Sequence, residues 1–173
     1  MAIEKVDYQN FPNCLQISNE EVEIVVTTNI GARILRYGFT GGENILGEHF
    51  DARVQTNLGE WKPYGGHRLW IAPENMPNSY APDDKPVEYE QINEFSARLA
   101  QSIEAATNAQ KEMTITLDAT GNGVTISHKL TNHDDAEMSA AAWAITIMRG
   151  GGEALIPREP FAPYSHDTLL PVR

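Results

Sequence analysis

Residues 61–74 carry the side chains of this chain that are best suited to chemistry. The segment reads WKPYGGHRLWIAPE and offers three aromatic rings, an imidazole, a guanidinium group and a carboxylate. Proteins bind sugars with such mixtures, because apolar C–H faces stack on aromatic rings while hydroxyls need fixed donors and acceptors. His67 could act as a general acid or base near neutral pH, and Arg68 could hold a sugar oxygen or a carboxylate. The segment therefore predicts a sugar site.

Each of these side chains also has a structural interpretation, which stands beside the functional one. Trp61 and Trp70 could be core anchors, Arg68 and Glu74 could form an exposed ion pair, and His67 could be a structural loop histidine. The adjacent glycines at positions 65 and 66 indicate a tight turn or a close backbone approach.

The remaining reactive residue types give weaker signals. Four further histidines, at positions 49, 128, 133 and 166, lack metal-binding spacing, and no nucleotide or cofactor motif occurs, so we expect neither a metal nor a cofactor. His128 alternates on an expected strand and should face solvent or a groove. The acidic pairs at 83–84 and 134–135 are typical of solvated turns. Cys14 has no disulfide partner and is expected to be a small buried residue.

Length and charge narrow the class of protein. The chain has 173 residues, enough for one domain with a core of its own, and a net charge of −11. An excess of acidic residues argues against nucleic acid and against anionic membrane surfaces, since both reward clusters of basic residues. No signal peptide or membrane span is visible, which predicts a cytoplasmic location.

Short β-type runs between turn residues must position the candidate site. We expect strands at residues 14–18, 22–27, 33–39, 87–95, 97–105, 113–118, 124–131 and 139–148. The four runs from 87 to 131 predict an antiparallel meander. Residues 43–86 hold the prolines, glycines and tryptophans of a long irregular functional loop, and residues 154–157 are expected to end a strand. The pattern predicts an all-β, antiparallel sandwich.

Several of these segments resemble a known family. Residues 29–34 (NIGARI) and 42–46 (GENIL) resemble the opening of aldose 1-epimerase (galactose mutarotase) relatives. Residues 64–74 resemble a mutarotase-like family in which a Gly-Gly-His-Arg-Leu-Trp segment follows that opening. Residues 130–132, 143–146 and 151–157 are similar to later strands of that family.

The resemblance implies a galactose mutarotase-like sandwich with a sugar groove on one concave face, and acid–base opening of the sugar ring without a cofactor. From their own chemistry, His67 and Glu74 are the candidate catalytic residues of such a groove, and Tyr64, Arg68, Trp70 and Trp143 are expected to line it and contact the sugar. The ligand would be a sugar or a sugar-like small molecule.

Two departures from the family bear on activity. Trp143 stands near the place of the catalytic histidine in mutarotases, and their catalytic glutamate lies in a C-terminal part that has no counterpart here, because those relatives are nearly twice as long. The chain would then form part of the sandwich and could associate with another copy. A mutarotase-like epimerase, a non-catalytic carbohydrate-binding module and an interaction domain therefore remain alternatives.

Overall fold

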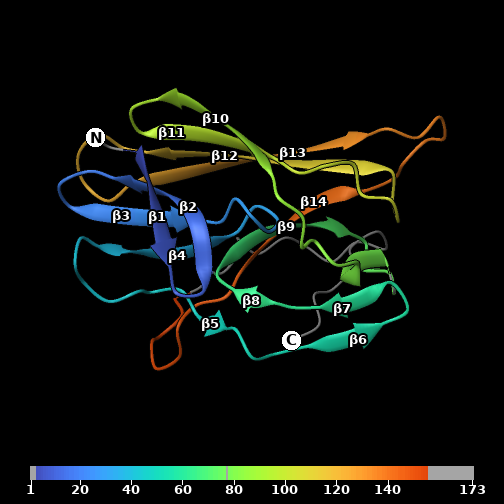
Figure 1. The fold of residues 1–173 in the computed structure, drawn as a ribbon, viewed down its shortest axis with the longest axis horizontal. Helices are drawn as coiled ribbons and strands as arrows, with labels where there is room; N and C mark the ends of the chain where they lie inside the picture. The colour runs from blue at the N-terminus through green and yellow to red at the C-terminus, as the bar shows by residue number, and fades with distance from the viewer. Residues whose placement is uncertain (1–2, 77, 156–173) are drawn as a thin grey trace, which may run out of the picture.

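The computed structural model describes residues 3–76 and 78–155 of the chain. Its described residues form fourteen strands and one short 3-10 helix, η1 (Asn78–Tyr80), and contain no α-helix. Two antiparallel sheets lie over one another (Figure 1). The prediction of an all-β, antiparallel sandwich is confirmed.

The larger sheet has six strands in the order β1-β2-β3-β4-β9-β14. Their bounds are β1 (Ile3–Tyr8), β2 (Phe11–Ser18), β3 (Val22–Val26), β4 (Ile34–Phe39), β9 (His67–Ala72) and β14 (Ala141–Thr146). β9 joins the first four strands to β14. It pairs with β4 only at Ile34 opposite His67, but it pairs with β14 over its whole length.

The smaller sheet has four strands in the order β10-β11-β12-β13. Their bounds are β10 (Glu88–Asn93), β11 (Ser96–Ala100), β12 (Ala109–Leu117) and β13 (Val124–Asn132). Each strand pairs with the next one along the chain, so the predicted meander is confirmed. The run expected at 97–105 ends at Ala100, and β12 begins four residues earlier than predicted.

The core lies between the two sheets. Inward-facing side chains at alternating positions of β2 and β3 meet those of β11 and β12, with Ile17, Ile24, Leu99 and Ile115 almost completely buried. In the sequence, β3 was identified from its run of β-branched, apolar residues rather than from alternation. Cys14 is also completely buried, as predicted.

Residues 43–86 do not form the long irregular loop that the sequence predicted. The segment contains two short antiparallel ribbons, β5 (Glu48–His49) with β8 (Tyr64–Gly65) and β6 (Val54–Thr56) with β7 (Gly59–Trp61). It also contains β9, a full strand of the larger sheet. The ribbons lie on the side of the larger sheet away from the smaller one (Figure 1). Because β9 is covered on both faces, its sequence lacks the alternation that marks half-exposed strands.

Three other expectations differ from the structure. β1 was not predicted, because this strand reads IEKVDY and its side chains are only half-buried or exposed. Ala154 and Leu155 are not in a strand, and residues 156–157 and His166 lie outside the described residues. Asp83, expected in a solvated turn, instead pairs with a buried arginine.

Candidate functional site

β9 positions the candidate site because its pleat sends successive side chains to opposite faces of the larger sheet. His67 lies on the inner face, where it contacts β13 of the smaller sheet. Arg68 and Trp70 lie on the outer face, under the ribbons of residues 48–65. The His67 side chain therefore points away from those of Arg68 and Trp70.

The two glycines before β9 place this strand within the sheet. Gly66 has a φ of 66°, and a Cβ at this position would lie 1.9 Å from the carbonyl oxygen of Ile34. Its N–H donates to the oxygen of Gly47 at 2.9 Å, and its oxygen accepts from the N–H of Ile147 at 2.8 Å. The chain therefore crosses three other segments at a point where only glycine fits, which agrees with the predicted close approach.

A cluster of aromatic rings covers the outer face of β9. The ring centroids of Trp61, Trp70 and Tyr80 lie between 5.1 and 5.6 Å from one another. Trp143, opposite Trp70 on β14, extends the cluster with a centroid distance of 5.5 Å. Trp61 and Trp70 are each 7% exposed, so the two indoles are core anchors of this outer layer.

Arg68 is buried within this aromatic cluster, and no carboxylate among the described residues pairs with it. Its guanidinium carbon lies 4.6 Å from the ring centroid of Trp61 and 4.4 Å from that of Trp70, which are cation–π distances. Its side chain is not an exposed ion-pair partner of Glu74: the residue is 4% exposed, and the Glu74 carboxylate accepts from the Tyr80 hydroxyl. Burial, with a smaller contribution from Arg33, lowers the pKa of Arg68 to about 10.

A second buried arginine lies on the same face and does have an acidic partner. Arg33 is fully buried and pairs with the carboxylate of Asp83. Its guanidinium lies 5.0 Å from the ring of Tyr64, which has a φ of 56°. Tyr64 therefore packs on Arg33, whereas Trp70 packs on Arg68.

On the inner face, two histidines join the sheets. The Nε2 atoms of His67 and His128 are 2.9 Å apart, and Nδ1 of His67 lies 2.7 Å from the hydroxyl of Thr146 on β14. Burial lowers the pKa of His67 to about 4, helped by His128, and burial also lowers the pKa of His128. His128 thus faces a second histidine between the sheets, rather than the solvent or groove expected from the sequence.

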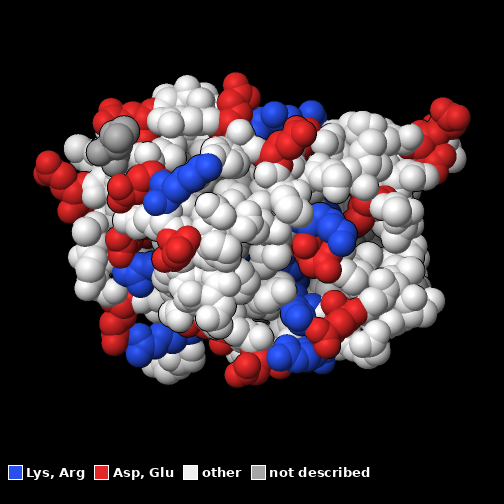
Figure 2. Space-filling view, viewed as in Figure 1, with Lys and Arg blue, Asp and Glu red and all other residues white. Residues whose placement is uncertain are grey.

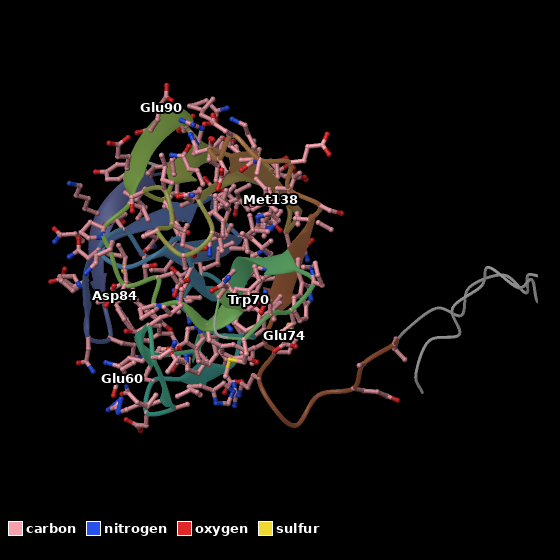
Figure 3. The ribbon with its side chains drawn as sticks, turned by 90° about the vertical axis from the view of Figure 1, so that its right-hand side faces the viewer. Glu60, Trp70, Glu74, Asp84, Glu90 and Met138 are labelled. Atoms are coloured by element: carbon pink, nitrogen blue, oxygen red, sulfur yellow. The ribbon has the colours of Figure 1, made fainter. Side chains whose placement is uncertain are left out.

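A hollow of about 230 Å³ opens at the end of β9 and the beginning of β14. Trp70, Ile71, Pro73 and Met138 give it apolar walls. Its polar lining consists of Asn75, Asn78, Ser79, Thr107, Ser139 and the ion pair of Glu104 with Lys111, whose charged atoms are 2.7 Å apart. Figure 3 shows Trp70 on this side of the molecule with Met138 above it. We call this hollow the Trp70 pocket.

The six predicted site residues lie in several different environments. Trp70 lines the Trp70 pocket, Arg68 and Trp143 contact Trp70, and Glu74 contacts Tyr80. Tyr64 lies with Arg33, and His67 lies on the opposite face. Neither predicted catalytic residue lines the Trp70 pocket.

Sequence reasoning missed the polar residues of this pocket and the partners of the arginines. Asn75 and Asn78 follow the predicted segment directly, and their nearness to Trp70 was the available signal. Asp83, Lys111 and Met138 are distant in sequence, and no local pattern links them to Trp70.

A metal-binding cluster and a membrane-spanning helix are both absent from the described residues. Within the described ranges, no group of three or more His, Cys, Asp or Glu side chains is placed to hold a metal ion. Residues 3–76 and 78–155 also include no helix long and apolar enough to cross a membrane.

Comparison of the chain with family models, with curated proteins and with solved structures finds no match. The resemblance to mutarotases therefore remains a prediction from short motifs.

Proposed function

We propose that this protein binds a small carbohydrate in the Trp70 pocket and does not transform it. The observation that carries the proposal is the composition of the pocket, which combines the Trp70 indole with several amide and hydroxyl groups. A volume of about 230 Å³ is below the roughly 300–1,000 Å³ of pockets for drug-sized ligands, and it suits a ligand about the size of one sugar ring.

The polar groups of the pocket are available to a ligand. The side-chain amides of Asn75 and Asn78 make no hydrogen bond to another described residue, and each offers donors and an acceptor. The Glu104 carboxylate already accepts from Lys111 and from Thr107, which holds that wall of the pocket in place. Free amides beside an indole and a fixed ion pair support the binding of hydroxyl groups.

Epimerisation would need an acid and a base that reach the same sugar. Neither His67 nor Glu74 lines the Trp70 pocket: the His67 side chain contacts His128 on the inner face, and a Glu74 carboxylate oxygen accepts from the Tyr80 hydroxyl. This separation favours the binding function over the mutarotase-like activity that the resemblance implies.

The test is NMR saturation transfer from the protein to a panel of neutral aldoses, with anomer exchange measured in the same samples. We expect saturation transfer to at least one aldose and exchange no faster than in the protein-free blank. Asn75→Ala combined with Asn78→Ala should abolish the transfer, because both amides line the pocket.

The matched control is Asn10→Ala, which removes an exposed amide in the turn between β1 and β2 and should leave binding unchanged. Binding of no aldose would refute the proposal. Exchange above the blank that is lost in His67→Gln or Glu74→Gln would refute the non-catalytic part and restore the epimerase alternative.

A further inference from the structure

We infer that the natural ligand is a neutral oligosaccharide, whose successive sugar units lie along three adjoining hollows of which the Trp70 pocket is one end. The inference rests on the proposed function and extends it from one sugar ring to a chain of rings. Two observations carry it: the hollows share lining residues, and every charged side chain in them is already paired.

The hollows follow one another along one side of the molecule. The Trp70 pocket shares Glu104 with a second hollow of about 490 Å³. The second shares Leu58, Pro82, Asp83 and Lys85 with a third hollow of about 370 Å³. In Figure 3, Glu60 and Asp84 of the third hollow lie at the left, whereas Trp70 and Met138 lie at the right. We call the three together the trough.

The dimensions of the trough exceed what a single sugar would occupy. Its middle hollow has about twice the volume of the Trp70 pocket. Leu58 and Ile103 expose large apolar surfaces to that hollow, with 40% and 49% of their area accessible. Apolar side chains of this kind can cover the C–H faces of sugar rings. Tyr64 lines one end of the trough and Trp70 the other, where Trp70 is only 7% exposed and packs within the aromatic cluster.

Each charged side chain that lines the trough pairs with an oppositely charged group of the protein. Glu60 pairs with Lys62 at 2.9 Å, Asp84 with Lys85 at 3.5 Å and Glu104 with Lys111 at 2.7 Å. The remaining carboxylate, that of Asp83, pairs with the buried Arg33. Every charged side chain of the lining therefore has a partner of opposite sign, and the loosest of these pairs is the largely exposed one of Asp84 with Lys85.

This pairing selects the chemical class of the ligand. An acidic or phosphorylated sugar would need an unpaired guanidinium or ammonium group, and it would also meet the repulsion of a chain with a net charge of −11. On the face shown in Figure 2, basic and acidic side chains are interspersed rather than gathered by sign. A neutral, hydroxylated chain can bind while every ion pair of the trough stays intact.

The test is calorimetric titration of the full chain with cello-oligosaccharides and malto-oligosaccharides of one to six units. Oligogalacturonates of the same lengths serve as the acidic counterpart. We expect affinity to rise by about tenfold or more between one and three units in one neutral series and then to level off. The acidic series should bind more weakly at every length.

Ile103→Asp changes the middle of the trough and should remove the gain with length while leaving binding of the single sugar intact. Ile92→Asp is the matched control, because Ile92 on β10 is 52% exposed and lines none of the three hollows.

The outcomes separate the two proposals. Binding of single sugars without any gain for longer neutral chains would overturn the trough and leave the proposed function standing. Tighter binding of the oligogalacturonates would overturn the neutral class. Binding of neither single sugars nor oligosaccharides would overturn the proposed function together with the inference.

Discussion

His67 and His128 are joined by their Nε2 atoms, 2.9 Å apart, and this contact connects β9 of the larger sheet with β13 of the smaller one. The two rings stack with centroids 5.1 Å apart. A hydrogen bond between two ring nitrogens needs one proton, so one Nε2 carries it and the other accepts.

Thr146 and the buried Nδ1 of His128 favour one tautomer for each ring. The Nδ1 of His128 has no hydrogen-bond partner among residues 3–76 and 78–155, and a buried N–H is left unpaired more rarely than a buried acceptor. We infer that His128 donates through Nε2 to His67, and that His67 donates through Nδ1 to the hydroxyl of Thr146. Both rings are then neutral, and a further proton would replace the bond with repulsion.

The histidine pair predicts that the free energy of unfolding decreases at mildly acidic pH. Burial lowers the pKa of His67 to about 4, whereas an unfolded histidine titrates near 6.5. Between these values the unfolded chain binds the proton and the folded protein does not, so the free energy of unfolding decreases as the pH falls from about 6.5 toward 4. Because His67 is partly exposed, we expect a loss of roughly 1–2 kcal/mol from this pair.

Urea unfolding at pH 7.5, 6.0 and 4.5 measures this loss. The double variant His67→Gln/His128→Gln should show a flatter dependence on pH than the wild type. His49→Gln, which removes an exposed histidine of β5, should keep the wild-type slope. Parallel curves for the wild type and the double variant would contradict the prediction.

The strands that were predicted correctly carry one of two sequence patterns. The β-branched run of β3 predicted a buried strand, whereas β13 alternates over most of its length and is separated from β12 by the turn at residues 120–123. β9 reads HRLWIA between Gly66 and Pro73, and its sequence shows no alternation of apolar and polar residues because the ribbons also cover its outer face. Only tertiary packing shows that this segment is a strand of the main sheet.

The candidate site was predicted less well for the same reason. His67 and Trp70 are three residues apart, which in a strand places them on opposite faces, but in a loop places no restriction. Once β9 is known to be a strand, the opposite orientation of the His67 and Trp70 side chains follows. The pairing of Arg33 with Asp83 spans fifty residues and had no local signal.

Substitution of Gly66 tests whether its close approach to Ile34 stabilises the position of β9 in the sheet. An added methyl group would meet the Ile34 carbonyl, which is backbone and cannot move aside, and the positive φ adds a cost of roughly 1–2 kcal/mol. We expect Gly66→Ala to lower the free energy of unfolding by clearly more than that amount, as measured by urea denaturation.

The matched control for Gly66 is Gly121. It has a similar positive φ of 79°, but a Cβ built on it meets no atom within 4 Å. Gly121→Ala should therefore show only the conformational cost. If both variants lost the same stability, the close approach of Gly66 to β4 would have no energetic weight.

Substitutions of Arg33 and Arg68 separate the stability lost by burying a charge from the stability gained when that charge has an acidic partner. Arg33→Met leaves the Asp83 carboxylate, which is largely buried, without its partner, and we expect a loss of about 3–5 kcal/mol. Arg68→Met removes a cation that pairs with no carboxylate among the described residues, and methionine still packs on the two indoles. The loss of two cation–π contacts is then offset by the loss of burial cost and of repulsion from Arg33.

The prediction is an order: Arg33→Met destabilises the protein more than Arg68→Met by at least about 2 kcal/mol in urea unfolding. The double variant Arg33→Met/Asp83→Leu should recover most of the loss, because it removes the stranded carboxylate together with its partner. An equal loss for the two single variants would mean that the rings of Trp61 and Trp70 hold Arg68 as strongly as Asp83 holds Arg33. The aromatic cluster would then be the main support of the outer layer, in place of the ion pair.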